Sequence, residues 1–105
     1  MIVSTTERIP GYEVELLGIV FGNTVRSKHL GKDITAFLKS LVGGELQEYT
    51  DMLIDARQEA MNRMINEASK LGADGVVNVR FATSQTGTRA AELIAYGTAV
   101  KLKRI

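Results

Sequence analysis

The sequence predicts an α+β protein: a mainly antiparallel sheet with one short and one long helix packed on it, in the order β-β-α-α-β-β. Three observations support this prediction. They are a long helical pattern in mid-chain, alternating apolar residues on both sides of it, and two closing strand patterns joined by a polar loop. The length of 105 residues predicts a single domain over residues 1–105, and a hydrophobic content of 45% indicates a globular chain.

The N-terminal segment is expected to begin as a strand and then to turn. The run IVSTT at residues 2–6 is typical of a short strand. Pro10 and Gly11 follow as a turn pair, because proline fixes φ at the first turn position and glycine accepts a positive φ after it.

The first long strand is predicted at residues 14–25, VELLGIVFGNTV, and it is apolar on both faces. A strand of this kind has to be covered on both sides. Gly18 and Gly22 within it indicate a bulge, a bend or a close approach of another backbone. Simple alternation places Val14, Leu16 and Val20 on one face and Leu17, Ile19 and Phe21 on the other.

Two helices are predicted next. A short one, at residues 32–44, has Asp33 as its N-cap and ends at Gly43-Gly44. A long one runs from about Glu45 to Leu71. Its main apolar stripe consists of Leu46, Tyr49, Leu53, Ala56, Ala60, Met64, Ala68 and Leu71. A second, narrower stripe consists of Ile54, Met61 and Ile65, and it is more than a two-layer domain needs, so it is a candidate contact with another helix or subunit.

A sharp corner, KLGADGVVNVRF at residues 70–81, joins the long helix to the third strand. Gly72 is expected to end the helix in a left-handed conformation, and Asp74 to bond backbone amides in the connection. Alternation predicts that Val77, Val79 and Phe81 face one way and Val76, Asn78 and Arg80 the other.

The last strand is predicted within residues 91–105, after a hairpin loop that contains Gly87. Its bulky face carries Ile94, Tyr96, Thr98, Val100 and Leu102, and its small-residue face carries Ala95, Gly97 and Ala99. The small face allows another element to pack close. We expect part of the sheet to remain apolar and uncovered in a single subunit, which predicts association.

Composition excludes several classes of protein. The chain has no cysteine, so it has no disulfide, thiolate metal site or cysteine nucleophile. It shows no secretory signal and no run near the roughly 18 apolar residues of a membrane span, so we expect a cytoplasmic protein that does not bind a membrane. A net charge of +1 without a dense basic stripe argues against a nucleic-acid partner.

Five short motifs in order give the chain a resemblance to a known family. They are STT at 4–6, VGG at 42–44 followed by Tyr49, AR at 56–57, LGADGVV at 71–77 and GTAVK at 97–101. Together they resemble the YbjQ-like family, over nearly the whole chain. The resemblance implies a fold similar to the dodecin subunit and a homopentameric ring. The family is largely uncharacterised, is sometimes labelled heavy-metal-binding, and offers no accepted catalytic residues to transfer.

This sequence contains few residues that could serve as ligands for a heavy metal. Copper and zinc favour thiolate and imidazole ligands, and the chain offers one histidine, His29, in a polar stretch. His29 is the weak metal candidate, since fivefold symmetry could gather its copies, but an exposed histidine without a ligand is the favoured interpretation. Met61 and Met64 could attract soft copper, but core filling is the commoner role. We therefore expect no metal and no other cofactor.

The ligand-binding candidates are two arginines, a hydroxyl run and one tyrosine. Arg57 could hold an anion in a forked contact, but an ion pair with a neighbouring subunit is favoured. Arg80 could line a ring, but a solvated position is favoured. Thr5 and Thr6, beside Ser4, could offer hydroxyls at a subunit edge, although such runs more often satisfy strand-end backbone groups. Tyr49, within the family-like pattern, completes the set.

The sequence favours a non-enzymatic, homo-oligomeric binding protein that takes a small ligand or ion at its subunit interfaces, and the family resemblance implies that the oligomer is a pentamer. The alternative is a structural ring, or one that docks another protein, without a small ligand. An enzyme is the least favoured class, since no catalytic triad order and no phosphate-binding glycine loop are present. Asp51 and Asp55 form a carboxylate pair on the long helix, where acidic pairs on a solvated face are common.

Overall fold

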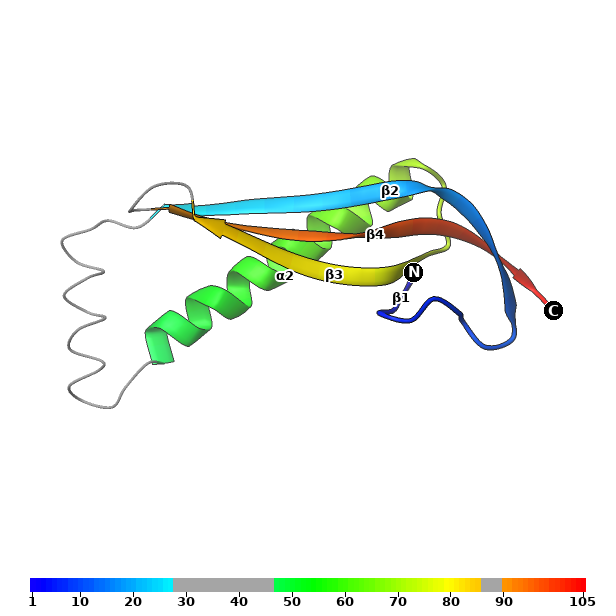
Figure 1. Ribbon diagram of the computed structural model, residues 1–105, viewed down its shortest axis with the longest axis horizontal. Helices are drawn as coiled ribbons and strands as arrows, with labels where there is room; N and C mark the ends of the chain where they lie inside the picture. The colour runs from blue at the N-terminus through cyan, green and yellow to red at the C-terminus, as the bar shows by residue number, and fades with distance from the viewer. Residues whose placement is uncertain (28–46, 86–89) are drawn as a thin grey trace.

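The computed structural model describes residues 1–27, 47–85 and 90–105 (Figure 1). The elements in chain order are β1 (Ile2–Val3), β2 (Tyr12–Ser27), α2 (Gln47–Lys70), β3 (Gly75–Gln85) and β4 (Ala90–Arg104). The predicted short helix at 32–44 and the hairpin residue Gly87 lie outside the described residues. The predicted long helix is confirmed over the residues where it is described.

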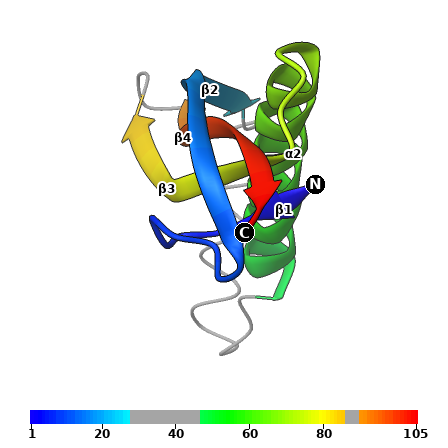
Figure 2. The ribbon, with the colours of Figure 1, turned by 90° about the vertical axis from the view of Figure 1, so that its right-hand side faces the viewer.

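The strands form one sheet in the order β1-β3-β4-β2. β2 and β3 both pair with β4 in antiparallel fashion, whereas β1 pairs with β3 in parallel through Ile2–Gly75 and Val3–Val76. The α+β class is therefore confirmed, with a mixed sheet. Figure 2 shows α2 on one side of this sheet. We call the side that α2 covers the helix face and the other side the open face.

A β-bulge in β2 overturns the simple alternation that the sequence predicts for this strand. Leu16 pairs with Val100 and Gly18 with Ala99, so Leu17 is an extra residue without a partner in the register. Because side chains alternate with a period of two, the extra residue exchanges the faces of everything after it. Ile19 and Phe21 therefore share the open face with Leu16, while Val20 lies on the helix face.

A second bulge changes the faces of β3. Val77 pairs with Thr98 and Arg80 with Tyr96, so Asn78 and Val79 together face Gly97. Asn78 has φ 54°, a left-handed conformation that asparagine tolerates better than most residues. Val79 joins Val76 in the core under the helix, and Val77 faces the other way. The predicted grouping of Val77 with Val79 is therefore wrong.

Small residues on the helix face let α2 pack close to the sheet. A Cβ on Gly22 would come within 2.0 Å of the Ala60 carbonyl oxygen, so only glycine fits there. The predicted small face of β4 is buried against this layer, and the core cluster on the helix face contains Val20, Ala60, Met64, Ala68, Val76, Val79, Ala95 and Ala99. The middle of the predicted helix stripe is therefore buried, whereas Leu53 and Leu71 near its ends are about half exposed.

The helix ends as the sequence predicts. Gly72 has φ +76°, its N–H donates to the Ser69 carbonyl, and the Ala73 N–H donates to the Ala68 carbonyl, which is the Schellman pattern. Asp74 then ties the corner to β4 rather than to the connection itself, because its Oδ2 accepts from the Leu102 N–H at 2.9 Å. No helix in the described part of the chain is long and apolar enough to cross a membrane.

Candidate functional site

The open face is covered at one end by the segment 4–11, which we call the arm. Ile9 of the arm packs on Val77 and Val100, and these three residues are 8%, 3% and 1% exposed. They form a second, smaller core, against which Tyr12 and Leu102 pack. The open face thus has an arm-covered end and an end that the described residues leave exposed at Ile19, Phe21 and Val25, which we call the bare end.

A hydrogen-bond network holds the arm on β3. The Arg80 Nη1 donates to the Thr5 carbonyl at 2.9 Å and also to the Val79 carbonyl. The Ser4 and Thr6 hydroxyls lie 2.5 Å apart, and the Thr6 hydroxyl donates to the Arg8 carbonyl. The structure therefore brings three predicted site residues, Arg80, Thr5 and Thr6, into one network. Apart from the contact between the Ser4 and Thr6 hydroxyls, the hydrogen bonds of these residues involve backbone groups of the arm and of β3, so they position the arm.

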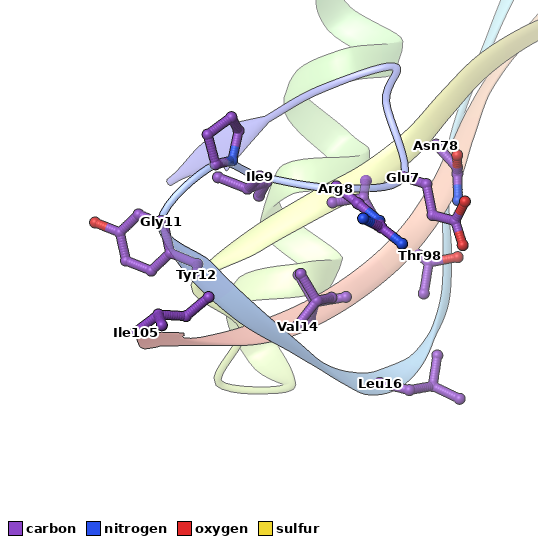
Figure 3. A pocket seen from close by; sticks show the side chains of 13 residues that line it. Glu7, Arg8, Ile9, Gly11, Tyr12, Val14, Leu16, Asn78, Thr98 and Ile105 are labelled. Carbon is purple, nitrogen blue, oxygen red and sulfur yellow. The ribbon is translucent and has the colours of Figure 1, made fainter.

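A groove of about 650 Å³ lies between the arm and the open face (Figure 3). Its apolar lining includes Ile9, Val14, Leu16, Val77 and Val100. Figure 3 shows the polar atoms of Glu7, Asn78 and Thr98 gathered at one end of the groove with Arg8 beside them, and Tyr12 and Ile105 at the other end. Its volume lies within the usual range of small-molecule sites, roughly 300–1,000 Å³.

Sequence reasoning missed the four polar residues of the groove. Glu7 and Arg8 stand next to an apolar residue and a turn pair, which indicates an arm that folds back over the sheet. Asn78 interrupts a run of valines, and asparagine is unfavourable in a strand but accepted in a left-handed bulge. Nothing in the pattern around Thr98 singles it out, because it alternates as an ordinary strand residue.

The other predicted site residues lie away from the groove or outside the residues that the structure describes. Arg57 is exposed on α2, so the sheet separates it from the groove. The backbone of Tyr49 belongs to α2, but its side chain is outside the described part, and so is the whole of His29. Ligand roles for Arg57, Tyr49 and His29 stay predictions.

The donor atoms of the described residues do not match a heavy-metal site. Among residues 1–27, 47–85 and 90–105, no three His, Cys, Asp or Glu side chains are grouped so that they could hold an ion. The whole sequence has no cysteine and a single histidine, whereas soft metals select thiolate and imidazole. The described residues therefore do not fit the label, and the prediction of no metal awaits measurement.

The fold and the groove define the class of protein. It is a small α+β protein whose helix covers one face of a mixed sheet, with the opposite face partly open in the described residues. A family model described as "Putative heavy-metal-binding", that of the YbjQ family, matches residues 1–103. The chain belongs to the YbjQ family.

Relatives and a solved structure agree with this assignment. The chain is 69% identical to a UPF0145 protein of Archaeoglobus fulgidus over 104 residues, which are 98% of this chain and 96% of that one. It is 73% identical to a UPF0145 protein of Methanoculleus marisnigri over 103 residues, 97% and 96% of the two chains. It also resembles the crystal structure of a DUF74-family protein of unknown function from Pediococcus pentosaceus, with a TM-score of 0.71, 17% identity and 98% of both chains covered. That likeness supports the fold alone.

Proposed function

We propose that the protein is a non-enzymatic, homo-oligomeric binding protein whose copies join through the bare end of the open face. The expected form is the five-copy ring that the family resemblance implies, with a small ligand bound near the interfaces. The proposal includes no resident metal or other cofactor. It assigns binding rather than catalysis because the groove lining offers one carboxylate and one guanidinium at its polar end, without a described contact between a nucleophile and a base.

The observation that carries the proposal is a set of large apolar side chains on the bare end. Ile19 is 69% exposed, Phe21 53% and Val25 56%, and all three lie on the open face of β2. Tyr96 lies beside them on β4, with its ring centroid 6.4 Å from that of Phe21. A contiguous apolar patch on a sheet is typical of an association surface.

The outer edge of β2 supplies a second reason to expect a partner. β2 has 16 residues and lies at the end of the strand order, so its outer backbone groups have no strand beside them in the described sheet. Arg63 of α2 reaches the Asn23 carbonyl on this edge. Unpaired edges of this length invite pairing with another chain.

The test is light scattering of the parent and of the double variant Ile19→Ser/Phe21→Ser at micromolar concentration. We expect the parent to have a multiple of the 11.5 kDa chain mass, and the variant to fall toward the single-chain mass with its helical circular dichroism retained. The matched control is Ile54→Ser, which changes an apolar side chain of α2 that is 44% exposed.

Two results would contradict the proposal. One is a parent protein with the mass of a single chain. The other is an assembly that survives the double variant but is lost in Ile54→Ser, because the second helix stripe would then be the interface.

A further inference from the structure

The groove under the arm is formed within one protomer and is held by backbone contacts. The Asn78 N–H donates to the Thr6 carbonyl at 3.1 Å, and the Ile105 N–H donates to the Gly11 carbonyl at 3.0 Å. The Tyr12 N–H donates to the Ile9 carbonyl at 3.1 Å, which closes the turn at the base of the arm. A ligand would therefore meet a groove whose shape is fixed before binding, which lowers the entropy lost on association.

Two parts of the groove lining favour different parts of a ligand. The apolar part consists of Val14, Leu16 and the small core beneath Ile9, where apolar surface can be removed from water. The polar part, which lies away from Tyr12 and Ile105, carries the Glu7 carboxylate, the Asn78 amide and the Thr98 hydroxyl, with the Arg8 guanidinium beside them (Figure 3). A matching ligand has a charged head and an apolar body.

The two charges of the polar end are opposite and lie next to each other in the chain. Yet within the described residues neither Glu7 nor Arg8 takes part in an ion pair. A carboxylate and a guanidinium that stay apart can each bind the opposite charge of a zwitterion. A ligand with only one charge could pair with either Glu7 or Arg8, and the remaining residue would have no opposite charge to bind.

We infer that the groove binds an apolar α-amino acid. Arg8 binds its carboxylate, Glu7 binds its ammonium group, and its side chain lies over Val14 and Leu16. The bulge at Asn78 places an amide at the polar end, where it can add a hydrogen bond. This inference rests on the proposed binding function, since it names the ligand class, but it does not rest on assembly because every lining residue comes from one chain.

The test is isothermal titration of the full-length protein with L-phenylalanine, up to 10 mM ligand (about the weakest affinity worth measuring). Two analogues separate the charges: 2-phenylethylamine keeps only the ammonium group, and 3-phenylpropionate keeps only the carboxylate. We expect L-phenylalanine to bind about tenfold more tightly than either analogue, because each loses one charge-assisted hydrogen bond.

Two charge variants assign the contacts. Arg8→Gln is expected to weaken L-phenylalanine and 3-phenylpropionate about tenfold and to leave 2-phenylethylamine unchanged. Glu7→Gln is expected to weaken L-phenylalanine and 2-phenylethylamine and to leave 3-phenylpropionate unchanged. The matched control is Arg57→Gln, which removes an exposed guanidinium from the opposite side of the sheet and is expected to change none of the three affinities.

Light scattering on the same samples separates this inference from the proposed function. No heat with L-phenylalanine, or equal affinities for Arg8→Gln and the parent, would overturn the amino-acid site, whatever the mass of the particle. A single-chain mass together with the expected pattern of affinities would keep the site and overturn the assembly.

Discussion

The two faces of the sheet are built from opposite kinds of residue. The helix face carries four small residues in β2 and β4, Gly22, Ala95, Gly97 and Ala99, and all four are buried beside three valines. The open face is lined by large ones, and Leu16, Ile19 and Phe21 are each more than half exposed. Three large apolar side chains of the long strand thus lie where the described residues leave them largely uncovered.

This difference shows that the most hydrophobic side chains of the sheet are not the ones that are buried within one subunit. On the helix face, small side chains allow the α2 backbone to approach the strands, and the close van der Waals contact stabilises the packing. On the open face, stabilisation would come from the burial of apolar surface area under a second copy. Among the described residues, the largest fully buried side chains are Met64, Val76 and Val100, and the proposed assembly would add to this small core.

The largest expected effect is on the helix face, at Gly22. In Gly22→Ala the new Cβ meets the backbone of Ala60 and Met64 at 2.0 Å and 2.4 Å, and a helix backbone cannot rotate away. We expect a loss of unfolding free energy of roughly 3 kcal/mol or more, measured by urea denaturation. Asn23→Ala, next in the chain but exposed, is the control and is expected to stay within about 0.5 kcal/mol. Equal stabilities for the two variants would contradict the close packing of α2.

A smaller effect is expected where the helix ends. Gly72 has a positive φ and nothing lies within 4 Å of a Cβ built on it, so any loss reflects backbone strain alone. Gly72→Val should lower the unfolding free energy by about 1–2 kcal/mol or more, because a β-branched residue disfavours this conformation. Gly72→Asn should retain more stability than the valine variant, since asparagine is the common substitute at this position. Thermal melting of the pair checks this, and a valine variant that melts with the parent would rule out the strain.

The bulge in β3 tests the arm-covered end of the open face. Asn78→Val should lose about 1 kcal/mol because valine at φ 54° is strained, while Asn78→Gly should stay within about 0.5 kcal/mol. Chemical denaturation of both variants measures the difference. If valine proved no worse than glycine, the left-handed conformation at this position would be excluded.

The smallest effect is expected at Arg63, which links the helix to the edge of β2. Its side chain is about half exposed, and it pairs with Glu59 on the next turn and reaches the Asn23 carbonyl. Arg63→Gln is expected to reduce the unfolding free energy by less than about 1 kcal/mol, and by less still at high salt, because exposed ion pairs are screened. Denaturation at low and high salt makes the comparison. A loss that grew with salt would show that charge is not the cause.

The sequence predicted the elements better than it predicted the faces. The long helix, its end at Gly72 and the small face of β4 follow from periodicity and glycine conformation, which are local properties. The faces of β2 and β3 were missed because each bulge adds one residue, and Leu17 in an apolar run gives no local sign of being the extra one. Gly18 did indicate an irregularity, but not its consequence for Ile19 and Phe21.

The candidate site was predicted only in part, for a similar reason. Thr5, Thr6 and Arg80 were selected by residue type, and the structure joins Arg80 to the Thr5 carbonyl across 75 residues of the chain. Glu7 and Arg8 acquire their place only because the arm folds back across β3 and β4, which no local pattern specifies. Pairings between distant segments are set by the whole fold rather than by neighbouring residues.

The bulge at Leu17 reverses the relation between residue number and sheet face in β2. Before it, even-numbered residues such as Leu16 lie on the open face, and after it the odd-numbered ones do. Deleting Leu17 would leave a regular strand with the present pairs, so Phe21 would stay on the open face. A strand that instead kept Leu17 as an ordinary paired residue would turn Phe21 toward the helix that now touches Gly22. The one extra residue thus decides which side chains of β2 pack against the helix and which lie on the open face.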